Sequence, residues 1–166
     1  ITPTFNAVAP ICSGAPLTAL PTSSTNSTPI TGTWSPALNN TATTTYTFTP
    51  AAGQCATTAT LTTVVNPNVV PTFNPVAAIC SGATAPVLPT TATNGITGTW
   101  SPATVSNTAT ATYTFTPTAG QCATTATLTV TVNPNVVPTF TPVAAICSGA
   151  TLTALPTTSN NGITGT

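Results

Sequence analysis

The five cysteines are the residues of this sequence with the most chemical potential, and they stand at positions 12, 55, 80, 122 and 147. The chain contains no Lys, Arg, Asp, Glu or His. A catalytic thiolate needs a nearby base or cation that lowers its pKa, and these residue types are absent. The sequence is repetitive, as described below, and each full repeat has two cysteines. Two cysteines without histidine or carboxylate do not complete a tetrahedral metal site. The remaining chemistry is disulfide formation, which indicates an oxidising compartment outside the cytosol.

The complete absence of charged side chains excludes several other classes of function. There is no general acid or base for catalysis and no carboxylate for a hard cation, so we expect neither enzymatic activity nor a cofactor. Without basic residues the chain has nothing to neutralise phosphates or anionic headgroups, so we expect no nucleic-acid partner. No apolar run approaches the roughly 18 residues of a membrane helix. We therefore expect no membrane insertion, and a mature or internal segment.

The sequence repeats itself with a period of 67 to 68 residues. Each copy opens with a PTF motif followed by ICSGA, and the two full copies continue with ITGTWSPA, YTFTP and GQCATTATLT. An NPNVVP segment joins successive copies, and its prolines favour an extended, semi-rigid linker. We expect repeat 1 at residues 1–66, repeat 2 at residues 67–133 and an incomplete repeat 3 at residues 134–166, each contacting its neighbours in a tandem array.

Residue alternation within each repeat predicts β-strands. Tyr113 and Phe115 share one face of a strand whose other face carries threonines, as in a half-buried strand. Thr, Val, Ile, Tyr and Phe dominate these stretches, with Pro and Gly between them. Each repeat is therefore predicted to be a small all-β sandwich of five to seven strands.

Six aromatic residues are predicted to form the cores of these sandwiches, because they lie on the apolar faces of their strands. Trp34 and Trp100 have an alternative role as stacking platforms for sugars. Each stands two residues after a glycine and on the same strand face as an isoleucine, Ile30 or Ile96, which favours a place in the core. The predicted core residues are Trp34, Tyr46, Phe48, Trp100, Tyr113 and Phe115.

The order of these motifs resembles the immunoglobulin-like modules that recur in giant cell-surface proteins of Bacteroidota. Such modules occur in SprB-type gliding-motility adhesins and in other cargo of type IX secretion. The resemblance covers the whole chain and implies a tandem array of disulfide-stapled, immunoglobulin-like β-sandwiches outside the cell. It implies a role in cell adhesion as a stalk, and a disulfide between the ICSG cysteine and the GQC cysteine.

Two pairing schemes suit the five cysteines. Pairing within repeats joins Cys12 to Cys55 and Cys80 to Cys122, and leaves Cys147 with a partner outside the chain. Pairing across linkers joins Cys55 to Cys80 and Cys122 to Cys147. We expect the first scheme, because a small unit buries little core and a staple over this separation would stabilise it by roughly 4 kcal/mol.

The outward threonines form the most distinctive predicted surface. They repeat about every 6.7 Å along a strand, and neighbouring strands lie about 4.8 Å apart, so they form a grid of hydroxyl and methyl groups. We expect a solubilising role, with binding of ice or a crystalline surface glycan as the alternative. The residues are Thr110, Thr112, Thr114, Thr116, Thr125, Thr127, Thr129 and Thr131.

The missing charge also permits side-by-side association, because charged gatekeepers normally protect strand edges from lateral pairing. The main prediction is the stalk or filament shaft of a bacterial adhesin. A self-associating subunit of an extracellular filament, with lateral copies of the chain as partners, is a further alternative.

Overall fold

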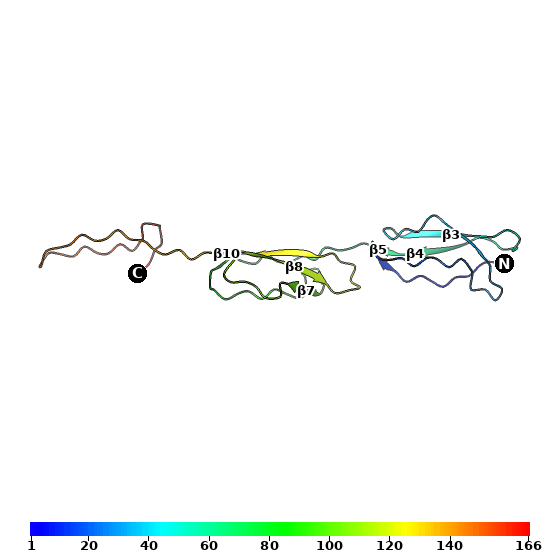
Figure 1. The fold of residues 1–166 in the computed structure, drawn as a ribbon, viewed down its shortest axis with the longest axis horizontal. Helices are drawn as coiled ribbons and strands as arrows, with labels where there is room; N and C mark the ends of the chain where they lie inside the picture. The colour runs from blue at the N-terminus through cyan, green and yellow to red at the C-terminus, as the bar shows by residue number, and fades with distance from the viewer.

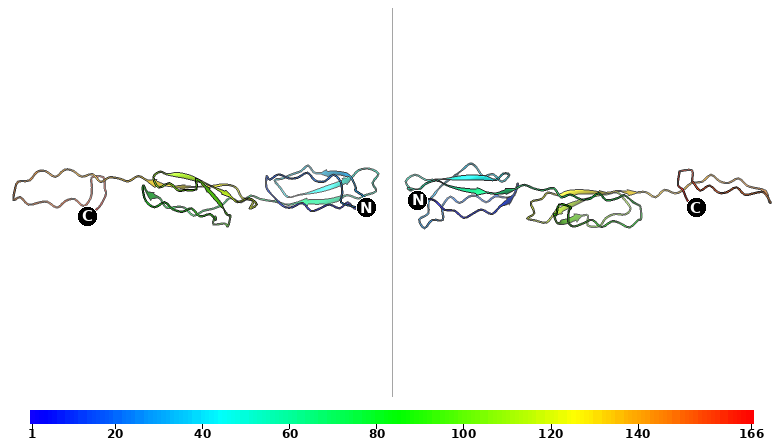
Figure 2. Two further views of the ribbon diagram at one scale, coloured as in Figure 1. Left: turned by 60° about the horizontal axis from the view of Figure 1, so that its bottom comes forward. Right: turned by 180° about the vertical axis from the view of Figure 1, so that it is seen from behind.

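The structure is a computed structural model that describes all 166 residues. It is all-β, as predicted, and has ten strands. Figures 1 and 2 show two folded units that follow one another along one long axis, with a third segment continuing the same line. The chain has no helix, so none is long and apolar enough to cross a membrane.

The first unit contains a three-stranded antiparallel sheet and a short parallel pair. The order in the larger sheet is β2-β3-β4, and β1 pairs with β5. In the register of the larger sheet, Trp34 lies opposite Phe48 and Tyr46 opposite Leu61. The strands are β1 (Ile11–Cys12), β2 (Gly32–Ser35), β3 (Thr44–Pro50), β4 (Ala59–Thr63) and β5 (Val65–Asn66).

The second unit repeats this arrangement. Its larger sheet has the order β7-β8-β9, and β6 pairs in parallel with β10. Trp100 lies opposite Phe115 and Tyr113 opposite Leu128, which matches the register of the first unit. The strands are β6 (Ile79–Cys80), β7 (Gly98–Ser101), β8 (Ala111–Pro117), β9 (Ala126–Val130) and β10 (Val132–Asn133).

The core of the second unit lies on the apolar face of its larger sheet. Tyr113, Phe115 and Val130 are buried there, and Phe73 packs against them from outside the strands. The ring centroids of Phe73 lie 4.7 Å from Trp100 and 4.8 Å from Phe115. Tilted and edge-on contacts at this distance are favourable between aromatic rings. The PTF motif that opens the repeat therefore supplies one wall of the core.

Gly98 lets β7 and β8 approach closely. A Cβ atom at this position would meet the carbonyl oxygen of Thr116 and the ring of Phe115. Gly32 has the same surroundings in the first unit, against Thr49 and Phe48. The glycine two residues before each tryptophan is thus required by packing.

The third segment, residues 134–166, has no named strand. It contains an isolated bridge between Thr158 and Thr164. Most of its large apolar side chains are exposed, including Phe140 and Leu155. Figure 1 shows it as an open, drawn-out loop beyond the second unit.

Candidate functional site

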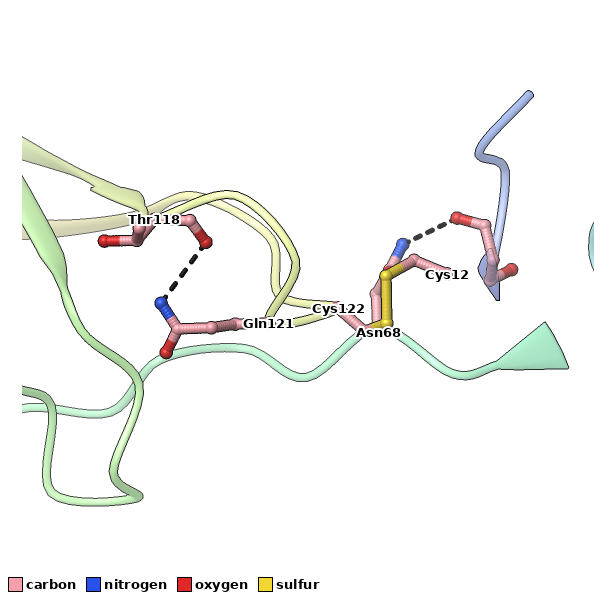
Figure 3. The surroundings of a disulfide bond; sticks show 6 residues. Cys12, Asn68, Thr118, Gln121 and Cys122 are labelled. Carbon is pink, nitrogen blue, oxygen red and sulfur yellow. Dashed lines mark hydrogen bonds between the residues drawn. A yellow bond between two sulfur atoms is a disulfide. The ribbon is translucent and has the colours of Figure 1, made fainter. Parts of the chain in front are cut away.

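The disulfide joins the two units to each other. Cys12 of the first unit bonds Cys122 of the second, with an S–S distance of 2.01 Å and a separation of 110 residues in sequence (Figure 3). Cys55, Cys80 and Cys147 are free and exposed. The prediction of pairing within repeats, Cys12 to Cys55 and Cys80 to Cys122, is therefore wrong. The alternative across linkers, Cys55 to Cys80 and Cys122 to Cys147, is also not formed.

The strand topology explains why a repeat does not pair its own cysteines. β1 carries Cys12 beside β5, which is the strand that leads out of the first unit. Cys55 lies at the entrance of the unit, where its carbonyl oxygen accepts a hydrogen bond from the amino group of Ile1. The two cysteines of a repeat thus lie at opposite ends of the unit, and the exit of one unit meets the entrance of the next.

Hydrogen bonds hold the linker at both sides of this junction. On the first unit, the Asn68 side-chain amide donates to the Ser13 carbonyl oxygen over 2.9 Å (Figure 3). On the second unit, the Val69 amide donates to the Cys122 carbonyl oxygen over 2.8 Å, and the Thr124 amide donates back to Val69 over 3.0 Å. Two adjacent linker residues are therefore fixed to different units, which restrains bending between them.

The GQC turn that carries Cys122 is anchored to its own unit. The Gln121 side-chain amide donates to the carbonyl oxygens of Thr118 and Thr97, and its oxygen accepts from the Thr97 amide over 2.8 Å. Cys122 has a φ of 47°, in the left-handed region that non-glycine residues seldom adopt. The glutamine thus fixes the turn that presents the sulfur to the preceding unit.

Sequence reasoning missed the linker residues Asn68 and Val69 as part of this site. It treated NPNVVP as a spacer, although the asparagine that follows the proline is present in both copies. The signal lay in the shortness of the linker, because a few residues bring the ICSG end of one unit against the GQC turn of the next.

The structure buries the predicted aromatic core residues to different degrees. Tyr46, Phe48, Tyr113 and Phe115 have 1% or less of their surface exposed, and Trp100 has 9% exposed. Trp34 is half-buried against Phe5 and Phe48. Each indole nitrogen donates to a proline carbonyl oxygen, from Trp34 to Pro21 and from Trp100 to Pro89, over 2.8 Å in both cases.

A groove of about 510 Å³ lies beside Trp100 and is lined also by Val87, Leu88 and Val105. Leu88 and Trp100 are buried members of the core, whereas Val87 is exposed. The Trp100 indole therefore packs in the core and leaves only 9% of its surface exposed to a ligand in this groove.

The predicted threonine surface lies on the outer face of the β7-β8-β9 sheet and its extensions. Seven of the eight residues are exposed, and Thr114 is half-buried between Ser101 and Thr127. Thr112 and Thr129 lie opposite each other with their hydroxyl oxygens 2.9 Å apart. The hydroxyl of Thr110 accepts from the Val132 amide over 2.8 Å and so also fixes β10.

Comparisons of the chain with protein-family models, curated proteins and solved structures found no match. No group of three or more His, Cys, Asp or Glu side chains is placed to hold a metal ion.

Proposed function

We propose that the chain is a structural section of an extracellular stalk or filament shaft, built from tandem immunoglobulin-like β-sandwiches, and that it catalyses no reaction. The observation that carries this proposal is the junction. One covalent bond joins the exit of the first unit to the entrance of the second, and three hydrogen bonds fix the linker residues between them to the two units. Covalent bracing between units suits a part whose task is to keep length and direction.

The disulfide also changes how tension passes along the chain. A pull on the two ends reaches Cys12 and crosses directly to Cys122, so the residues between them are not stretched while the bond is intact. The bond favours a location outside the reducing cytosol, and the motifs that resemble Bacteroidota surface adhesins add cell adhesion to the proposal. The partners proposed for the units are their neighbouring repeats.

Single-molecule force spectroscopy on the chain, held at its two ends, tests this load path. Because the disulfide closes a separation of 110 residues, adding a reductant should lengthen the fully extended chain by roughly 380 Å, at about 3.5 Å per residue. A Cys55→Ser variant is the matched control and should show the same gain, since Cys55 is free. An oxidised chain that extends as far as the reduced chain would contradict a covalently braced stalk.

A second candidate function is binding of ice or a crystalline glycan, and the exposed rows of threonines on β8 and β9 favour it. Replacing Thr112, Thr114, Thr127 and Thr129 with Ser removes four methyl groups and keeps the hydroxyls. If the chain is only a stalk, neither the wild type nor this variant should show thermal hysteresis or be retained on insoluble polysaccharide. Binding by the wild type that is lost in the variant would establish the second candidate instead.

A further inference from the structure

We propose that the bond between Cys12 and Cys122 is one step of a disulfide ladder. In this ladder, the ICSG cysteine of each repeat bonds the GQC cysteine of the repeat that follows it. Cys80 is then free to bond the GQC cysteine of a following repeat, and Cys55 is free to bond the ICSG cysteine of a preceding one. This pairing rule goes beyond the stalk role, because it states which cysteines bond to each other and does not depend on whether the array carries a load.

The backbone around the free Cys80 matches the backbone around the bonded Cys12. The Ser81 amide donates to Asn133 over 2.8 Å, as the Ser13 amide donates to Asn66 over 2.8 Å. The amide of the preceding isoleucine donates to the carbonyl oxygen of the residue just before the paired strand, over 3.0 Å in the second unit and 3.1 Å in the first. The exit of the second unit is therefore folded as at the closed junction.

The linker that leaves the second unit is also in place. The Asn135 side-chain amide donates to the Ser81 carbonyl oxygen over 3.0 Å, and its counterpart Asn68 donates to Ser13 over 2.9 Å. Residues 133–140 have the same sequence as residues 66–73, NPNVVPTF. The chain therefore leaves the second unit beside Cys80 as it leaves the first unit beside Cys12, where the following unit supplies the bonded Cys122. This continuity selects a following repeat as the partner of Cys80.

The other free position, Cys55, is held like the bonded Cys122. Its φ is 46°, against 47° for Cys122. The Thr57 amide donates to the Ile1 carbonyl oxygen over 2.9 Å, as the Thr124 amide donates to Val69 over 3.0 Å. Ile1 thus occupies the place that linker residue Val69 occupies at the junction. The GQC turn is already shaped to receive a preceding unit.

Cys55 and Cys80 do not serve as partners for each other within one chain. Cys55 lies beside Ile1 at the entrance of the first unit, and Cys80 lies beside β10 at the exit of the second. Figure 1 shows these two places at opposite ends of the pair of units.

Closing each step is a thiol–disulfide exchange with a small-molecule or protein disulfide as the oxidant. The two cysteine thiols give up two electrons and two protons as their S–S bond forms. The S–S bond of the oxidant breaks, and its two sulfurs take up the electrons and protons as two thiols.

The test is a chain extended after Thr166 by a second copy of residues 100–133, which completes the third repeat. After oxidation with oxidised glutathione, mass mapping of non-reduced peptic peptides should show the added GQC cysteine bonded to Cys80. Cys55 and Cys147 should remain open to alkylation. A bond from the added cysteine to Cys147, or no bond, would overturn the ladder. A bond between Cys80 and Cys55 of another molecule would overturn the choice of a following repeat and favour a second copy.

Two matched variants of the extended chain make the assignment specific. Cys80→Ser should leave the added cysteine reduced, whereas Cys147→Ser should leave its bond intact. Burial of the added tryptophan, followed by fluorescence, reports whether the third unit has folded.

A variant of the unextended chain tests the same pairing rule without a new unit. In Cys122→Ser, the ladder predicts that Cys12 becomes reactive to alkylation and forms no bond to Cys55, because the two lie at opposite ends of one unit. Recovery of a Cys12–Cys55 bond from this variant would overturn the ladder.

Discussion

The second unit and the third segment begin with nearly the same sequence and differ in how much of it they bury. Phe73 packs against Trp100 and Phe115 in the second unit. Its counterpart Phe140 has 52% of its surface exposed, because residues 134–166 contain no partner strand with aromatic residues. The apolar contacts of the opening motif thus depend on strands that come later in the repeat.

The tight turn near the end of the third segment behaves differently. The Ser159 amide donates to Ile163 and the Gly165 amide donates to Thr157, matching the bonds that Ala92 and Gly98 donate in the second unit. The Asn161 side chain donates to the Val137 carbonyl oxygen over 2.9 Å, as Asn94 donates to Val70 over 2.8 Å. The geometry of this turn therefore needs only the first half of the repeat, which includes the linker residue Val137, whereas the core needs the whole repeat.

The largest expected effect comes from removing a ring of the second core. Phe115→Ala should lower the free energy of unfolding of the second unit by about 3–5 kcal/mol, because the fully buried ring leaves a cavity. Phe140→Ala in the third segment should change the free energy of unfolding by less than about 0.5 kcal/mol, because this ring is exposed. Hydrogen exchange of the β8 and β9 amides measures the second unit separately from the first. Equal effects of the two substitutions would break the comparison.

A smaller effect is expected from adding a methyl group where two strands approach. Gly98→Ala places a Cβ against the Thr116 carbonyl oxygen and the Phe115 ring, and should cost about 1–3 kcal/mol through overpacking. The counterpart Gly165→Ala meets no atom within 4 Å and should be tolerated. Urea midpoints of the two variants provide the measurement, and a Gly98→Ala protein as stable as the wild type would show that β7 does not need this approach.

The smallest expected effect separates the first unit from the second. Thr63 is fully buried, and its hydroxyl has no hydrogen-bond partner, whereas Val130 occupies the corresponding position in the second unit. Thr63→Val removes the unpaired polar atom at nearly constant volume and should stabilise the first unit by about 1 kcal/mol. Thermal unfolding of this variant beside Val130→Thr should show shifts of opposite sign. A loss of stability in Thr63→Val would contradict the packing described for β4.

Sequence patterns predicted the strands and the aromatic core because both follow from alternation along a single segment. Tyr113 and Phe115 alternate with threonines, and the structure buries them on one face of β8. The pairing of Cys12 depended instead on which ends of two units meet. Cysteine connectivity does not follow from sequence spacing, and the parallel pairing of β1 with β5 sets it here.

The threonine face was predictable as a surface, but its hydrogen bonding was not. Alternation placed Thr112 and Thr129 on the outer face, where both are exposed. That they lie opposite each other and share a hydrogen bond follows from the strand register, which the turn between β8 and β9 determines.

The central claim is that the junction holds two units end to end. Energy transfer between dyes on the free cysteines Cys55 and Cys80, in a Cys147→Ser background, measures the distance between their outer ends directly. We predict one narrow population of low transfer, and a broader population of higher mean transfer when Cys12→Ser and Cys122→Ser are combined. High transfer in the oxidised chain, or the same distribution with and without the disulfide, would contradict the account.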